Sequence, residues 1–303
     1  MNYPCTIISM KTKTRLKGYI FAIVSAVIYG SMPLMARHIY ADGVNAPTLV
    51  FLRNILALPS LAILTLLTQK SFKADAKTFF AISIPSLFGC AVTPVLLFAS
   101  YSYLPSGTST VFHFIYPALT LVIGIFFLKK KAVLSTVISI ALCFLGVALF
   151  YDPSASFNWG GAALALGSGV TFAIYVVLLP YFKNRGVSGF LFSFYMTLWS
   201  SVLMLIICLT TNQLALPRTF TGWGLCILFS FLVTTCAVVL FQQGTFIIGG
   251  EKTAILSTLE PITSVLIGIT VFGEPFSVKT AIGCILVVGA SVLIALSDIK
   301  RKS

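Results

Sequence analysis

The chain has 303 residues, of which 58% are hydrophobic and 9% are charged, and its formal net charge is +13. A soluble protein needs about 25% charged residues to cover its surface, so this composition excludes an ordinary soluble globular protein. The 22 glycines and 13 prolines form no low-complexity tract, which excludes a disordered chain as well.

The apolar residues fall into ten runs, each about as long as a helix that crosses a roughly 30 Å hydrocarbon core. Lipid offers the backbone no hydrogen-bond partners, and the alternation typical of a β-barrel is absent, so each run is predicted to be a helix. In chain order the predicted spans are Gly18–Met35, Pro47–Thr68, Thr78–Ala99, Thr108–Leu128, Leu134–Tyr151, Trp159–Leu179, Gly189–Leu209, Gly222–Thr245, Glu251–Val271 and Val278–Leu296. The predicted fold is an all-α integral membrane protein with ten transmembrane helices.

The first run follows a basic stretch, residues 1–17, and resembles a signal peptide. Its apolar part is too long for one, and no A-x-A cleavage pattern follows, so it is predicted to be a retained first helix. The chain ends in a second basic stretch, residues 297–303. Both stretches are predicted to lie in the cytoplasm.

The basic residues are distributed unevenly between the two sides of the predicted membrane. Sixteen of the 20 lie on the side of the N-terminus, and the other half holds Arg37, Arg53, Arg218 and Lys279. This bias is typical of cytoplasmic loops, so the net charge is interpreted as an orientation signal and not as a nucleic-acid-binding surface. A multi-pass protein of a cell (inner or plasma) membrane is expected, with an organellar membrane as the alternative.

Seven cysteines are present, six of them within predicted spans and none in a C-x-x-C pair. Cysteine inside an apolar helix behaves as a small hydrophobic residue. We therefore expect packing roles for the cysteines, no disulfide, no metal site and no cofactor.

The second half of the chain repeats the first at a shift of 143 to 144 residues. Gly43-Val44 corresponds to Gly186-Val187, and Pro117 corresponds to Pro261. The predicted repeats, residues 18–151 and 159–296, each contain five helices. Because five is odd, the second copy crosses the membrane in the opposite sense, and inverted repeats of this kind are a recurring architecture of secondary transporters.

Two segments carry a family resemblance. The sequence LEPITSVLIGITVFGEPFS at 259–277 resembles the last unit of EamA-type proteins of the drug/metabolite transporter superfamily. The segment at 26–58, with its Phe-Leu-Arg on the second predicted helix, is similar to the opening of the first unit. The resemblance implies a ten-helix carrier, similar to exporters of small metabolites. The first repeat departs from the pattern, since it has Tyr116-Pro117 and Lys129-Lys130 where the second has Glu260-Pro261 and Gly273-Glu274.

Glu260 is the acidic residue that lies deepest in a predicted span, about 13 Å of helix rise from Glu251. Ionisable side chains inside a membrane are costly and are therefore functional candidates. Glu260 is predicted to couple protons or to bind a substrate amine. The structural alternative is a hydrogen bond to a neighbouring helix, for example to the amide of Gln242 or Gln243.

Pro117 and Pro261 occupy matched positions in the two repeats. Each removes a backbone donor and clashes with the carbonyl four residues earlier, which predicts two matched kinks. The kinks either expose carbonyl groups toward a cavity or serve packing alone.

His113 and Tyr116 share a helix face, and they correspond to Ser257 and Glu260 in the second repeat. The inverted axis is expected to bring these two polar faces toward one centre. His113 either titrates during transport or makes a structural hydrogen bond. The other histidine, His38, is expected in a loop.

Arg53 lies about two turns into the second predicted span, within reach of the outer surface. The favoured interpretation is a structural ion pair with Glu274, and the alternative is attraction of a substrate carboxylate. Candidates for lining a cavity suited to flat or amphipathic substrates are Tyr29, Tyr101, Tyr175, Tyr195 and Trp199. Anchoring at the membrane interface is the favoured interpretation for each of them.

The function that the sequence favours is a secondary transporter, an exporter of small metabolites such as amino acids. A channel or facilitator is the main alternative. An integral-membrane enzyme is disfavoured, because the H-E-x-x-H, G-x-S-x-G and P-loop patterns are absent. The expected partners are a small-molecule substrate, the lipid bilayer and protons as a coupling ion. No nucleic-acid partner is expected, and the predicted state is a monomer or weak dimer.

Overall fold

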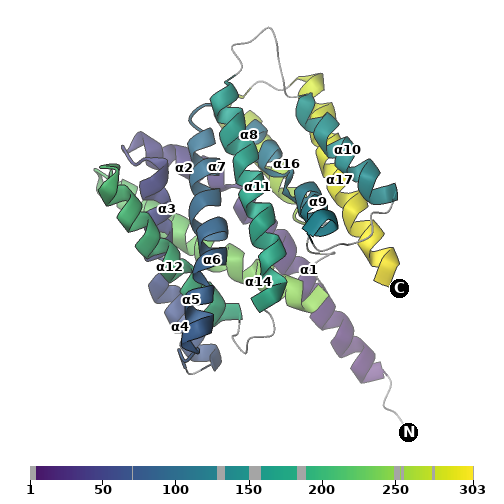
Figure 1. Ribbon diagram of the computed structural model, residues 1–303, viewed down its shortest axis with the longest axis horizontal. Helices are drawn as coiled ribbons and strands as arrows, with labels where there is room; N and C mark the ends of the chain where they lie inside the picture. The colour runs from purple at the N-terminus through teal and green to yellow at the C-terminus, as the bar shows by residue number, and fades with distance from the viewer. Residues whose placement is uncertain are drawn as a thin grey trace.

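Every regular element in the part of the chain that the structure describes is a helix. The computed structural model describes residues 5–69, 71–127, 134–149, 158–182, 189–248, 253, 256–274 and 277–302. The first half contains α1 (Cys5–Gly30), α2 (Met32–Ala41), α3 (Ala46–Ile55), α4 (Leu58–Gln69), α5 (Ala76–Ala81), α6 (Ser83–Ser86), the π-helical segment η1 (Leu87–Val92), α7 (Thr93–Ser100), α8 (Ser106–His113), α9 (Tyr116–Phe127) and α10 (Leu134–Ala148). The second half contains α11 (Trp159–Phe182), α12 (Gly189–Thr210), α13 (Phe220–Phe229), the π-helical segment η2 (Ser230–Ala237), α14 (Val238–Ile248), α16 (Leu259–Phe272) and α17 (Val278–Lys302) (Figure 1).

Six helical stretches among the described residues are long and apolar enough to cross a membrane. They are Arg15–Ala41, Ala46–Thr68, Ala76–Ser100, Trp159–Leu179, Gly189–Thr210 and Phe220–Phe241. Shorter apolar helices, α16 among them, accompany these six. The all-helical membrane fold is therefore confirmed, whereas the count of ten spans stays a prediction.

The first predicted span differs from the structure in one respect. Gly18–Met35 was expected as one helix, but α1 ends at Gly30 and α2 begins at Met32, with Pro33 in its first turn. His38 lies in α2, so the loop placement expected for it is wrong. Proline is tolerated in a first helical turn, where its missing N–H removes no helical hydrogen bond.

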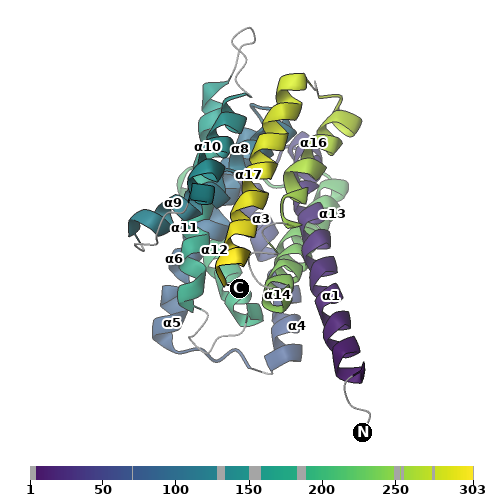
Figure 2. The same ribbon diagram turned by 90° about the vertical axis from the view of Figure 1, so that its right-hand side faces the viewer.

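The helices of the two halves pack in a reciprocal pattern. The pairs α1 with α14 and α7 with α11 join the first and third helical spans of one half to the third and first of the other. The pairs α3 with α12, α8 with α16 and α10 with α17 join elements at corresponding positions (Figures 1 and 2). Exchanging the two halves leaves this pattern unchanged, as a two-fold relation between repeats requires.

The direction of α8 against α16 agrees with inverted repeats. Ser106, at the start of α8, contacts Glu274 just beyond the end of α16. Thr110, one turn further along α8, contacts Ser264, which lies earlier in α16. The two helices therefore run antiparallel. They belong to the fourth and ninth predicted spans, at matched places in the two repeats.

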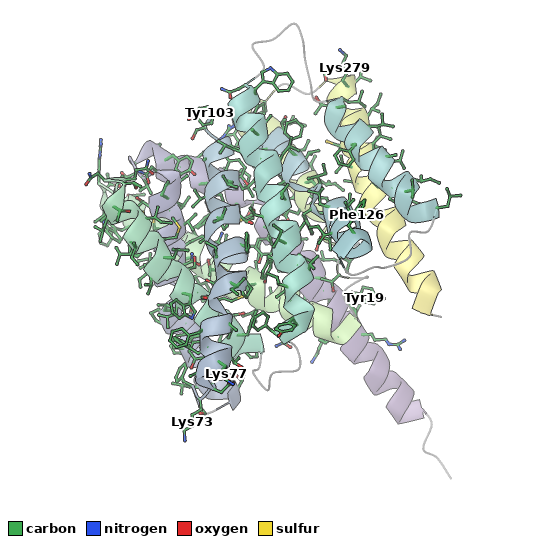
Figure 3. The ribbon with its side chains drawn as sticks, viewed as in Figure 1. Tyr19, Lys73, Lys77, Tyr103, Phe126 and Lys279 are labelled. Atoms are coloured by element: carbon green, nitrogen blue, oxygen red, sulfur yellow. The ribbon has the colours of Figure 1, made fainter. Side chains whose placement is uncertain are left out.

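The two ends of the helix bundle carry different side chains. Lys73 and Lys77 lie at the lower end in Figure 3, the end from which the N-terminus projects in Figure 1. Tyr103 and Lys279 lie at the upper end. We call these the basic end and the far end.

Side-chain caps fix the starts of helices on both ends. Asn45 at the start of α3 accepts a hydrogen bond from the Thr48 amide, and Thr219 at the start of α13 accepts one from Gly222. Asp75 does the same for α5 at the basic end. Each cap satisfies a backbone donor that helix geometry leaves unpaired, and it sets where the chain enters the bundle.

Candidate functional site

The first helix break lies between α8 and α9. The helix stops at His113 and resumes at Tyr116, and Pro117 has no N–H to donate to the His113 carbonyl. A Cβ atom on Gly169 of α11 would lie only 2.8 Å from that carbonyl oxygen, so a glycine is needed where α11 crosses the break. The freed carbonyl is therefore covered by packing against α11.

His113 is held by a neighbour. Its Nδ1 atom lies 2.9 Å from Ser168 Oγ of α11, and its ring packs 5.4 Å from the ring of Phe172. Ser168, in the Gly-Ser-Gly sequence of α11, thus serves as a hydrogen-bond partner. This contact favours the structural interpretation of His113.

The second break lies just before α16. Ser257 and Thr258 form a turn, α16 begins at Leu259, and Glu260 is 8% exposed in its first turn. A Cβ atom on Gly30, at the end of α1, would lie 2.6 Å from the Glu260 carbonyl oxygen. The end of one helix in the first repeat is therefore fitted closely to the start of α16.

Tyrosines surround Glu260. The Glu260 carboxyl group lies within electrostatic range of Tyr29, Tyr101 and Tyr116. Tyr175 extends the group, since Tyr116 packs edge-on against Phe172, which in turn contacts Tyr175. We define the central site as Glu260, Arg53 and these four tyrosines, Tyr29, Tyr101, Tyr116 and Tyr175.

Arg53 enters the central site from α3, and both expectations about its structural role are wrong. Its side chain is 6% exposed and does not reach the outer surface, and Glu274 pairs instead with Arg37. The Nε atom of Arg53 donates to Thr234 Oγ1 at 3.2 Å, and its guanidinium lies over the ring of Phe98. Tyr29 and Tyr101 lie within electrostatic range of both Arg53 and Glu260.

Among the tyrosines of the site, Tyr101 is enclosed by other helices and is not an interface anchor, whereas Tyr29, Tyr116 and Tyr175 are partly buried. Tyr101 is 4% exposed and belongs to the largest apolar cluster, against which Tyr29 also packs. Tyr195 and Trp199 lie elsewhere. They donate hydrogen bonds to the backbone carbonyls of Phe72 and Phe79, and they form an aromatic cluster with residues of both repeats.

The predicted bond between Glu260 and a glutamine amide stays a prediction. Gln242 and Gln243 both lie on α14, but the side chain of Gln242 is outside the described residues. Gln243 is partly buried. Within the described residues no ion pair reaches Glu260.

The structure contains two π-helical segments that the sequence did not predict. Segments η1 and η2 begin at Leu87 and Ser230, which are 143 residues apart and so correspond in the two repeats. Asn54 donates to the Cys90 carbonyl of η1, and Ser230 of η2 donates to the Arg53 carbonyl. A π-helical turn widens a helix and often marks a functional site. Pro85 and Pro94 flank η1, and Pro94 has no N–H to donate to the Cys90 carbonyl, whereas no proline or charge lies in or beside η2.

A cluster of polar contacts, which we call the clasp, joins the repeats at the far end. Arg37 Nη2 lies 2.7 Å from Glu274 Oε1, which also accepts the Ser106 amide at 2.8 Å and the Ser106 hydroxyl at 3.0 Å. Gly273, with φ +62°, ends α16 in a left-handed turn that directs Glu274 toward α8. The Glu274 carboxylate of the second repeat thus caps α8 and neutralises Arg37, both of which belong to the first repeat.

A second polar tie lies beside the clasp. Asp42 accepts hydrogen bonds from the amides of Arg218 and Thr219. Burial would raise the pKa of the Asp42 carboxyl, but hydrogen bonds from Thr219 and Arg218 and the Arg218 charge hold it below its usual range. The carboxylate is therefore ionised at neutral pH, and it links α2 to the start of α13.

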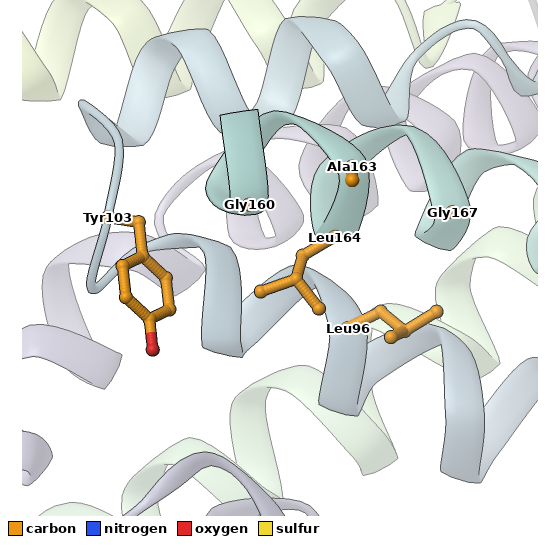
Figure 4. Close-up of a pocket in the computed structure, with 6 residues that line it drawn as sticks. All are labelled: Leu96, Tyr103, Gly160, Ala163, Leu164 and Gly167. Atoms are coloured by element: carbon orange, nitrogen blue, oxygen red, sulfur yellow. The ribbon is translucent and has the colours of Figure 1, made fainter. Parts of the chain in front are cut away.

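A groove of about 490 Å³ lies on the outside of the bundle. It is lined by Leu96, Tyr103, Gly160, Ala163, Leu164 and Gly167 (Figure 4). The lining is nearly all apolar, with the Tyr103 hydroxyl as its polar side-chain group, and it includes no residue of the central site.

Comparisons with known proteins agree with this architecture. A sequence model described as the EamA-like transporter family matches residues 16–151 and again residues 159–296. An "uncharacterized transporter" of Clostridium kluyveri is 20% identical over 302 residues, covering 91% of this chain and 92% of the relative. An "uncharacterized inner membrane transporter" of Salmonella typhimurium is 23% identical, covering 94% and 97%. A solved crystal structure aligns with a TM-score of 0.63 at 14% identity, covering 94% of this chain and 99% of the other, which shows the fold alone.

Proposed function

Because this chain belongs to the EamA-like transporter family, we propose that it is a secondary carrier that exports small metabolites such as amino acids. Its relatives are named as transporters, and a transporter is not an enzyme. The proposed carrier works by alternating access, in which two inverted repeats move around a central site.

The proposed topology has ten spans, with both termini in the cytoplasm. The proposed location is the inner or plasma membrane of a cell. Six spans are the long apolar helices, and α8 with α9, α10, α16 and α17 supply the other four. Lys73 and Lys77 at the basic end support a cytoplasmic orientation of that end. The clasp then lies at the outer end.

Two repeat-related helix breaks face one buried centre, and this arrangement is the main support for a carrier. Discontinuous helices near the middle of the membrane are typical of substrate and ion sites in transporters. Glu260 lies 14 residues before Glu274, or about 20 Å of helix rise from the far end, which is a depth inside a roughly 30 Å core. Tyr29, Tyr101 and Tyr116 of the first repeat lie within electrostatic range of its carboxyl group.

Closure at the far end comes from contacts between repeats. The clasp joins Glu274 of the second repeat to α2 and α8 of the first, and Asp42 adds a second tie to α13. In the alternative state these polar groups become accessible to water, which replaces the hydrogen bonds that are lost. A polar closure of this kind opens at a lower cost than an apolar interface of the same area.

We assign proton coupling to Glu260. Its carboxyl group is buried without an ion-pair partner among the described residues, and hydroxyl groups surround it. Such a group changes its charge more readily than it keeps an unpaired charge in an apolar medium. His113 is assigned a structural role because Ser168 holds its ring.

Transport by the purified protein in proteoliposomes tests the proposal. Vesicles loaded with each of a panel of unlabelled metabolites are diluted into trace amounts of the labelled compound. A carrier gives saturable, transient accumulation of label above equilibrium, because exchange across alternating states is coupled. Linear flux that does not saturate would indicate a channel and would contradict the proposal.

A further inference from the structure

Arg53 is a buried cation with few partners. Its side chain is 6% exposed, its Nε donates to Thr234, and its Cζ lies 5.7 Å from the centre of the Phe98 ring. Within the described residues the arginine that forms an ion pair is Arg37, and no carboxylate contacts Arg53. A buried charge without a counter-charge is strongly destabilising, so the guanidinium needs an anionic partner for part of the transport cycle.

The surroundings of Arg53 include donors suited to an anion. Tyr101 is 4% exposed, and its hydroxyl makes no hydrogen bond of normal length among the described residues, although Thr110 lies close enough to interact with it. Tyr29 and Tyr101 both lie within electrostatic range of the guanidinium. A carboxylate accepts hydrogen bonds from phenol and guanidinium groups together, and bonds of this charge-assisted kind are among the stronger ones in proteins.

Arg53 interacts with both π-helical segments. Cys90 of η1 lies within electrostatic range of the guanidinium, and Thr234 of η2 bonds to it. These two residues are 144 residues apart, within one residue of the offset between the two segments, and so lie at similar positions in the two π-helical turns. Arg53 therefore lies between two matched π-helical turns, although its own counterpart, Met196, is uncharged. The symmetric backbone surrounds a single positive charge.

A structural role for Arg53 does not account for these contacts. The bond from Ser230 to the Arg53 carbonyl already joins α3 to η2, and it uses only the backbone of Arg53. A neutral hydrogen-bonding side chain would satisfy Thr234 at lower cost than a buried guanidinium. The charge itself is what the packing leaves unexplained.

We infer that Arg53 is the anion-binding residue of the central site, and that the transported molecules carry a carboxylate or another anionic group beside an apolar or aromatic body. This inference rests on the proposed carrier function. Tyr101 and Tyr29 supply hydrogen bonds to the anionic group, and the rings of Tyr175 and Phe172 contact the body of the molecule.

Cys90 provides a test that needs no knowledge of the substrate. In a protein whose other six cysteines are replaced by alanine or serine, Cys90 is labelled with two methanethiosulfonate reagents of similar size, one anionic and one cationic. The anionic reagent is expected to react faster, because Arg53 concentrates it at the thiol. In Arg53→Gln the ratio of the two rates falls by about tenfold or more, whereas Arg53→Lys keeps most of it.

Controls separate this inference from the carrier function and from folding. Lys279→Gln removes an exposed charge from the far end and is expected to leave the rate ratio unchanged. Size-exclusion profiles identify any variant that fails to fold, and if Arg53→Gln is one of them, a ratio of about one in the wild-type background would overturn the inference. An equal ratio in wild type and Arg53→Gln would overturn the inference, as would a Cys90 that reacts with neither reagent. Counterflow that persists in either case leaves the carrier function intact.

Discussion

The two helix breaks lie at matched positions of the two repeats, but their side chains differ in chemistry. At the first, His113 is bonded to Ser168, and the following proline leaves a carbonyl that packs on Gly169. At the second, Glu260 lies beside Pro261, and Gly30 packs on the carbonyl of Glu260. Repetition of the sequence thus sets where the helices open, while substitution within one copy decides which opening carries an ionisable group without an ion-pair partner.

The largest expected effect comes from removing the acid at the second break. Glu260→Gln keeps the shape of the side chain and removes its ability to lose a proton. Because the amide cannot carry the coupling proton, we expect gradient-driven accumulation in proteoliposomes to fall by about tenfold or more, which corresponds to about 1.4 kcal/mol. Substrate exchange is expected to continue. An unchanged pH dependence of transport in this variant would refute proton coupling by Glu260.

The glycines at the two breaks allow a matched comparison. Gly30→Ala and Gly169→Ala each place a Cβ atom within 3 Å of a backbone oxygen, at the second and the first break respectively. Each is expected to cost about 1–3 kcal/mol and to lower the melting temperature measured in detergent. Gly289→Ala is the control, since a Cβ atom there meets nothing within 4 Å, and it should leave the melting temperature equal or slightly higher.

The first break is expected to respond as a structural element. Ser168→Ala leaves the buried Nδ1 atom of His113 without its partner, which costs about 1–3 kcal/mol in the free energy of unfolding. The pH profile of transport should nevertheless match that of the wild type. A profile shifted as far as that of Glu260→Gln would place a titrating group at the first break and remove the difference between the two.

The smallest effect is expected away from both breaks, at Asp42. Its pKa is depressed, so the stability that it contributes is present above the usual carboxyl range and is lost as the pH falls through its folded-state value. Asp42→Asn should therefore lower the melting temperature slightly at pH 7 and make no difference in strong acid. Equal melting curves at both pH values would show that this tie contributes nothing to stability.

Much of the architecture could be predicted because it depends on periodic properties. Apolar runs of membrane length predict helices, the constant offset predicts the repeat, and Pro117 and Pro261 point to the positions where the structure breaks the helices. The side-chain partners could not be predicted in the same way. The pairing of Glu274 with Arg37 instead of Arg53 depends on the tertiary contact between α2 and α16, which no local sequence pattern specifies. The matched π-helical turns depend on backbone geometry that no single residue type signals.

A distance across the far end tests alternating access most directly. Spin labels at Tyr103 of the first repeat and Lys279 of the second, both exposed side chains, report on the separation of the repeats beside the clasp (Figure 3). In a cysteine-free protein in liposomes we predict two populations of distances, with Glu274→Gln shifting the balance toward the longer one. A single distance that is the same in both proteins would contradict the account.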